Sequence, residues 1–197
     1  MKIIICPGIH ETELTESFIK GCFNLASEKL ISENPVDILV FPADGILALS
    51  AFHIVQFLRD ILPQNNRLEL PIVFIGFSAG VIGAIGAAVA WQQLGGCVRA
   101  FIAIDGWGVP LWGNFPIHRL SHDYFTHWSS ALLGSGENNP NNFYAEPPVD
   151  HLCLWRSPQT VKGWSVNASI KKPETQAYLT ASEFLQFLLK DYETKYS

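Results

Sequence analysis

Short runs of branched and aromatic apolar residues recur along the chain, and each ends in residues that favour turns. They are "KIIIC" (2–6), "DILVF" (37–41), "PIVFIG" (71–76), "VRAFIAI" (98–104) and, more weakly, "NFYAE" (142–146). Such runs are typical of strands that are buried on both faces. Between them, apolar residues recur at helical spacing over about 14–31, 46–62, 79–94 and 174–190. This alternation predicts an α/β fold, with a mostly parallel sheet of about five or six strands and helices on both faces.

The stretch 72–91 has no charged side chain, and it is long enough for a membrane-spanning helix of about 20 residues. Glycines at 76, 80, 83 and 86 would weaken such a helix, and the first part of the stretch is rich in β-branched residues. The second part is rich in alanine and runs to Gly95-Gly96, which favours the end of a helix. We therefore interpret the stretch as a strand, a tight turn and a helix.

The turn itself reads "GFSAG" (76–80), with a serine between two glycines. A Gly-x-Ser-x-Gly turn between a strand and a helix is the nucleophile elbow, in which the serine hydroxyl stands clear of the sheet. The N–H groups of the first turn of the helix favour negative charge beside that hydroxyl. Ser78 is therefore the candidate nucleophile. The alternative is a chance match in a glycine-rich turn.

Composition narrows the class of protein. The chain has 197 residues, of which 48% are apolar and 16% charged, with a net charge of −5. These values favour one compact domain over 1–197 and argue against disorder and against a nucleic-acid or anionic-membrane surface. None of the four cysteines forms a CxxC pair, and Pro7-Gly8 ends the first apolar run too early for a signal peptide. We expect a cytoplasmic protein without a membrane span.

The segment 107–141 has no clear period and contains several large aromatic residues. We expect it to form a lid-like excursion over the site. The aromatic residues that we expect to line an apolar acyl pocket are Trp107, Trp112, Phe115 and Trp128. The alternative is that they form the core of the lid itself.

The "GFSAG" turn within alternating strands and helices resembles the α/β-hydrolases, the family of esterases, lipases and thioesterases. The resemblance implies a trimmed fold without the usual N-terminal antiparallel strands, and a Ser-His-acid triad. "IIICPGIHET" (3–12) is similar to the family's oxyanion loop. The resemblance thus implies an oxyanion hole formed by the backbone N–H of Ala79 and one N–H near Ile9 or His10.

The base and the acid follow from chain order, which in this family is serine, acid, histidine. His151 follows the last candidate strand and resembles the terminal histidine of thioesterase domains, although it could also be a loop histidine that packs on Trp155. Asp105 ends the strand after the predicted elbow helix, where it would face the same crevice as Ser78, although it could also be an exposed turn residue. The rival acids are Asp150, Asp123 and Asp44, and the other histidines are His10, His53, His118, His122 and His127.

His118, His122, Asp123 and His127 are spaced closely enough to hold a metal if their segment folds back, but no HExxH-like signature is present. We therefore expect no metal and no organic cofactor. The predicted function is hydrolysis of a small-molecule acyl ester or thioester by Ser78, His151 and Asp105. The alternatives are an acyltransferase with the same triad and a catalytically silent protein of the same fold that binds a ligand or partner.

Overall fold

The computed structural model describes residues 1–23, 37–43, 45–134, 141–167 and 177–194. The strands are β1 (Lys2–Cys6), β2 (Asp37–Val40), β3 (Ile72–Phe77), β4 (Val98–Ile104), β5 (Ile117–Ser121), β6 (Asn141–Ala145), β7 (Lys162–Asn167) and β8 (Ala177–Thr180). The helices are α1 (Thr12–Phe23), α2 (Ala51–Ile61), α3 (Gly80–Gln93), α4 (Tyr124–Ala131), α5 (His151–Arg156) and α6 (Ala181–Thr194), with a 3-10 helix η1 (Gly45–Leu49).

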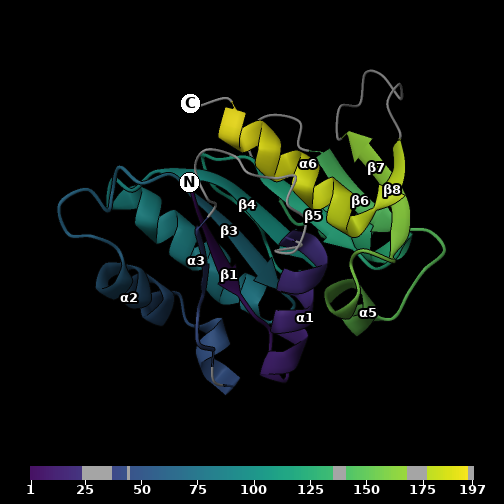
Figure 1. Ribbon diagram of the computed structural model, residues 1–197, viewed down its shortest axis with the longest axis horizontal. Coiled ribbons are helices and arrows are strands. Elements are labelled where there is room, and N and C mark those ends of the chain that lie inside the picture. Colours follow the sequence, from purple (N-terminus) through teal and green to yellow (C-terminus); the bar gives the residue numbers. More distant parts are fainter. Residues whose placement is uncertain (24–36, 44, 135–140, 168–176, 195–197) are drawn as a thin grey trace.

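The strands form one eight-stranded sheet in the order β2-β1-β3-β4-β5-β6-β7-β8 (Figure 1). Neighbouring strands from β2 to β6 are parallel, whereas β7 and β8 are antiparallel additions at one edge. The α/β fold class and the mostly parallel sheet are therefore confirmed. The sequence did not predict the antiparallel pair, whose strands are short and carry polar residues.

Helices cover both faces of the sheet (Figure 1). Side chains of α1, α5 and α6 pack into the core on one face, and those of α2 and α3 pack into the core on the other. In β1, Ile3 and Ile5 face the first core while Ile4 and Cys6 face the second. Because successive side chains of a strand point to opposite faces, a strand covered on both sides must be apolar throughout. Each large side chain that is fully buried in this way stabilises the fold by ~1.5–3 kcal/mol.

The uncharged stretch 72–91 divides as expected between strand β3 and helix α3. Every residue of β3 is buried, and α3 packs closely against the end of β1. A side chain at Gly80 would overlap the carbonyl oxygens of Cys6 and Pro7, so only glycine permits this approach. Of the helices that the structure describes, none combines the length and the hydropathy of a membrane span.

Three of the expected helices differ in detail. The stretch 46–62 contains η1 followed by α2, because Ser50 accepts a hydrogen bond from the N–H of His53 and begins a new helix. The expected helix over 174–190 is strand β8 followed by α6, and its first three residues lie outside the described residues. Helix α1 is described up to Phe23, so the rest of the expected helix over 14–31 also lies outside the described residues.

The segment 107–141 was expected to be an excursion, but much of it belongs to the main fold. It supplies β5 to the middle of the sheet and α4, which packs against β5 and β6. Strand β5 is "IHRLS", and all five residues are buried although three are polar. Polar residues interrupt the apolar run by which a buried strand is recognised, so β5 could not be predicted from the sequence. The lid-like role of the remaining loop stays a prediction.

Candidate active site

Ser78 lies at a strained turn between β3 and α3. Its backbone φ is +52°, a left-handed conformation that residues other than glycine rarely adopt. Such a conformation costs roughly 1–3 kcal/mol and persists only where the surrounding structure holds it. Here the N–H of Ser78 donates to the carbonyl of Ile104 at the end of β4, at 2.9 Å. Ser78 therefore lies at a strained strand-to-helix turn, beyond the carboxyl end of β3.

Asp105 occupies the equivalent position on the next strand. It directly follows β4, its φ is +50°, and its N–H donates to the carbonyl of Leu120 in β5 at 2.8 Å. Its side chain is only 1% exposed. A buried carboxylate needs hydrogen-bond donors or positive charge nearby. The groups that contact the Asp105 carboxylate therefore matter for its stability as a buried charge.

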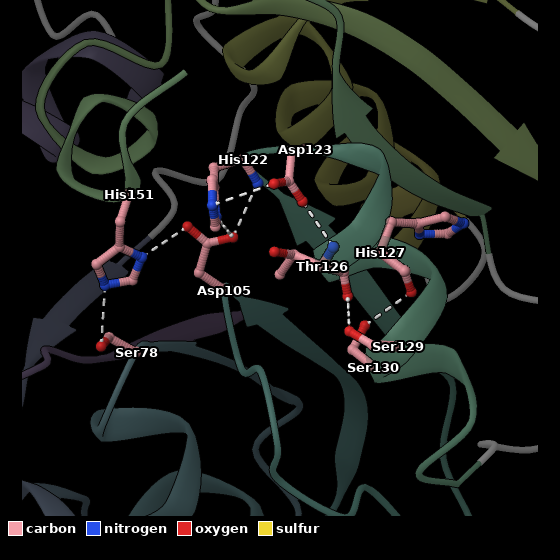
Figure 2. A network of polar contacts seen from close by, with 9 residues as sticks. All are labelled: Ser78, Asp105, His122, Asp123, Thr126, His127, Ser129, Ser130 and His151. Atoms are coloured by element: carbon pink, nitrogen blue, oxygen red, sulfur yellow. Dashed lines mark hydrogen bonds and ion pairs between the residues drawn. The ribbon is translucent and has the colours of Figure 1, made fainter. Parts of the chain in front are cut away.

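One of those contacts is His151, the first residue of α5. His151 Nδ1 lies 2.8 Å from Asp105 Oδ2, and His151 Nε2 lies 3.1 Å from Ser78 Oγ (Figure 2). A hydroxyl, an imidazole and a buried carboxylate are thus joined in one chain of hydrogen bonds. With Nδ1 donating to the carboxylate, Nε2 is left with a lone pair that can accept the hydroxyl proton.

A second histidine contacts the same carboxylate. The backbone N–H of His122 donates to Asp105 Oδ1 at 2.8 Å, and His122 Nδ1 lies 3.1 Å from that oxygen. The Nδ1 contact has the distance of an ion pair but not the alignment of a hydrogen bond. The sequence did not predict the contact between His122 and Asp105, because His122 directly follows β5, the strand that could not be recognised. Recognition of the end of β5 would have placed His122 at the same edge of the sheet as Asp105.

A pocket of about 290 Å³ opens over these groups. Its lining residues are Ser78, Ala79, Ile82, Asp105, Trp107, Val109, His122, Thr126 and His151. Its apolar lining comes from α3 and from the loop after β4, through Ile82, Trp107 and Val109, and most of the other lining side chains are polar. It is at the small end of the range for ligand pockets, which is roughly 300–1,000 Å³.

The aromatic residues expected to line the pocket separate into three environments. Trp107 lines it and is 66% exposed. Trp112 and Trp128 are about half exposed and are not among its described lining residues. Phe115 is buried in the core between the sheet and α3, so its role is structural.

The loop after β1 passes beside Ser78. A Cβ at Gly8 would lie 3.1 Å from Ser78 Cβ. Ala79 lines the pocket at the start of α3, whereas the side chain of Ile9 is exposed and the His10 ring packs near Phe77 and Trp155. The assignment of Ala79, Ile9 and His10 to an oxyanion hole stays a prediction.

The rival acids and bases lie in other environments. Asp123 begins α4 and accepts from the N–H of Thr126 at 2.6 Å, and Asp150 precedes α5 without a side-chain capping bond. His118 is buried between Asn141 and Tyr192, and His53 lies beside Ser50. His127 stacks on Tyr144, and His10 contacts the carbonyl of Glu11. Asp44 lies outside the described residues.

The four residues considered as a metal site do not converge, because His118 and His127 are directed elsewhere. Within the described part of the chain, the donor atoms that do lie together are those of Asp105, His122 and His151, all within 4.8 Å of one another. In this group His151 Nε2 is already engaged by Ser78 Oγ, at 3.1 Å.

Comparison with known proteins adds a likeness of fold. No protein-family model matches the chain, and no curated protein matches it. Among solved structures it is similar to one described as "YbtT - Type II thioesterase from Yersiniabactin NRPS/PKS biosynthetic pathway". The TM-score is 0.56 over 100% of this chain and 94% of that chain, at 11% sequence identity. A structural likeness at this sequence identity shows the fold and not the activity. The chain therefore has the α/β-hydrolase fold of that enzyme.

Proposed function

We propose that the protein is a serine hydrolase that cleaves small acyl esters or thioesters, with Ser78, His151 and Asp105 as its catalytic triad. The observation that carries the proposal is the continuous hydrogen-bond chain from Ser78 Oγ through His151 to the buried Asp105 carboxylate. Surface contacts rarely give this arrangement, because it needs three segments far apart in sequence to meet at one strained turn. Ser78, Asp105 and His151 all line the pocket.

In this mechanism Ser78 Oγ attacks the acyl carbonyl while His151 Nε2 takes its proton. Asp105 holds the imidazole in the tautomer with the proton on Nδ1 and stabilises the imidazolium that forms. His151 then gives the proton to the departing alcohol or thiol, which leaves an acyl group on Ser78. A water molecule, deprotonated by His151, releases the acid and regenerates the serine.

The negative oxygen of each tetrahedral intermediate needs donors. In the proposal the N–H of Ala79, at the start of α3, is one donor, and the loop after β1 near Ile9 or His10 supplies the other. Gly8 permits that loop to lie against the nucleophile. In other enzymes the removal of one such donor costs about 3–4 kcal/mol of transition-state stabilisation.

The pocket favours a short acyl group. Its volume of about 290 Å³ and its apolar walls, which include Val109 and Ile82, suit a few carbon atoms. The similar solved structure is described as a thioesterase, which supports thioesters as the first substrates to test. The chemistry requires neither a metal nor an organic cofactor, and the partner in the reaction is a small molecule.

The test combines active-site labelling with a substrate panel. A fluorophosphonate probe should label the wild-type protein and not Ser78→Ala, while circular dichroism shows that both are folded. Acyl esters and acyl-thioesters of increasing chain length should then be turned over by the wild type, and a chelator should leave the rate unchanged. Labelling that persists in Ser78→Ala would disprove the assignment of the nucleophile.

The same experiment separates the remaining alternatives. A labelled serine without turnover of any substrate in water would favour an acyltransferase, and addition of an alcohol or thiol acceptor would then restore turnover. A folded protein without labelling would indicate a catalytically silent member of the fold. Activity that is lost on chelation would favour a metal-dependent reaction over the serine mechanism.

A further inference from the structure

Two imidazoles share one buried carboxylate at this site. Asp105 Oδ2 lies 2.8 Å from His151 Nδ1, and Asp105 Oδ1 lies 3.1 Å from His122 Nδ1 (Figure 2). The triad alone requires only the first of these contacts. A carboxylate carries one negative charge, so a positive charge on either ring reduces what remains for the other.

The backbone of His122 also connects the acid to the base. Its N–H donates to Asp105, and its carbonyl accepts from the N–H of Val149 at 3.1 Å, two residues before His151. The ring of His122 lies across that of His151, with centroids 5.9 Å apart and planes inclined by 74°. His122 can therefore influence His151 in two ways, by helping to hold the segment before α5 in place and by the charge of its own ring.

The charged groups that face the His122 ring come from every element around it. Asp105 at the end of β4 and Asp123 at the start of α4 lie 3.1 and 3.6 Å from its two nitrogens. Asp150 before α5 acts at longer range, and His151 is the facing imidazole. Contact with Asp105 raises the pKa of His122, burial partly opposes the rise, and the charges of Asp105, Asp123 and Asp150 add to it. The ring is thus in an environment that favours its cationic form.

We propose that His122 is a positioning residue whose protonation controls how strongly Asp105 supports His151, so that an acid-side switch is built into the triad. The proposal rests on the proposed hydrolase function. In the transition state His151 becomes positive and needs the full charge of Asp105. A positive His122 neutralises part of that charge and repels the imidazolium.

The size of the effect follows from the ring separation. A second positive charge about 6 Å from His151, at an effective dielectric constant of about 20, slows the chemical step by roughly 10- to 100-fold. The enzyme is therefore faster when His122 is neutral than when His122 carries a proton. The rate profile should bend where His122 gains its proton, and a variant without a titrating group at position 122 should lack that bend.

The test is the dependence of log kcat/KM on pH, from about pH 5 to about pH 9, for wild type and His122→Gln. Glutamine retains the backbone N–H to Asp105 and a side-chain donor but does not titrate. We expect the wild type to show a bend that is absent from His122→Gln. On the acid side of that bend the variant should be faster than the wild type by roughly 10- to 100-fold, and the ratio of the two rates should fall as the pH rises through it.

Two further variants make the test specific. Asp123→Asn removes a carboxylate that faces His122 Nε2, while asparagine can still cap α4 through the N–H of Thr126. The bend assigned to His122 should therefore move to lower pH with no loss of rate above it. His127→Gln changes a histidine on α4 that does not contact Asp105, and its profile should keep the His122 bend.

The outcomes separate this proposal from the proposed function. Identical profiles for folded wild type and His122→Gln would show that His122 has only a structural role. If His122→Gln fails to fold, a bend that stays at the same pH in Asp123→Asn as in the wild type would overturn the proposal equally well. Failure of the proposed function would be seen in a different result, namely equal activity in Ser78→Ala and wild type.

Discussion

The ring of Phe77 lies flat against the imidazole of His151, with centroids 4.9 Å apart and planes inclined by 16°. Phe77 is the last residue of β3 and directly precedes Ser78, so one side chain connects the nucleophile's strand to the proposed base. Trp155, one turn further along α5, stacks on Phe77 at 4.5 Å, and Phe18 stacks on Trp155 at 3.7 Å. The imidazole is thus supported by a stack of aromatic rings that reaches helix α1.

We expect Phe77→Leu to lower kcat while the protein remains folded. Leucine retains an apolar side chain at a fully buried position but removes the flat surface behind the imidazole. Stacked aromatic pairs are worth ~0.5–1.5 kcal/mol, which corresponds to a fall of ~2- to 12-fold. Steady-state kinetics measure the fall, and thermal unfolding serves as the control for stability. An unchanged kcat would show that the hydrogen bond to Asp105 alone positions His151.

The assignment of acid and base predicts an order of effects. His151→Ala should lower kcat by at least about a thousandfold, because a serine without its base retains only oxyanion stabilisation and binding. Asp105→Asn should cost less but still more than about tenfold, since the amide can hold the wrong imidazole tautomer. Asp123→Asn and Asp150→Asn are the matched controls and should be mild at neutral pH. A larger loss in either control than in Asp105→Asn would reassign the acid.

The position of Trp107 predicts its effect on chain-length preference. Trp107 lines the pocket, whereas Trp128 does not, although both are well exposed. Trp107→Ala should favour longer acyl chains by about fourfold in relative kcat/KM for each additional methylene that the enlarged pocket buries. Trp128→Ala, the matched control, should leave the preference unchanged. The same shift in both variants would place the acyl chain outside the pocket described here.

The half-buried residue His127 predicts how stability depends on pH. Burial, assisted by the charge of Arg119, lowers the pKa of His127 to about 4. Between its ordinary value of about 6.5 and about 4 the unfolded chain binds a proton that the folded chain does not, so stability falls as pH falls. The loss attributable to this residue is ~2–3 kcal/mol. Denaturant unfolding should show a shallower loss over that range in His127→Gln, and parallel curves would contradict the prediction.

The sequence predicted the parts of the site that lie at the ends of recognisable strands. Ser78 follows an apolar strand and precedes an alanine-rich helix, so local pattern was sufficient to place it. Asp105 follows the next apolar strand, and the parallel sheet then brings the two side by side. His151 follows β6 and required the family resemblance as well. The structure brings these three residues together, and their catalytic roles stay predictions.

Other parts could not be predicted because their stability comes from distant partners. His118 and Arg119 lie buried in β5, where His118 contacts the hydroxyl of Tyr192 in α6 and Arg119 donates to the carbonyl of Gly134. No pattern within five residues can show bonds of that kind. With β5 unrecognised, the position of His122 at its end was also unrecognised. The prediction of the aromatic pocket lining was incomplete for a similar reason, because the path of the loop after β4 decides which tryptophan faces the pocket.

The hydrogen bonds of the proposed triad join residues 73 and 46 positions apart in the chain. Contacts between such distant segments close large loops, and their entropy cost is met only once the intervening strands and helices are in place. The proposed chemistry requires α5 to be docked beside β3 and β4, whereas secondary structure alone does not. Recovery of catalytic rate after dilution from denaturant would therefore report the docking of α5, and circular dichroism would report the growth of secondary structure.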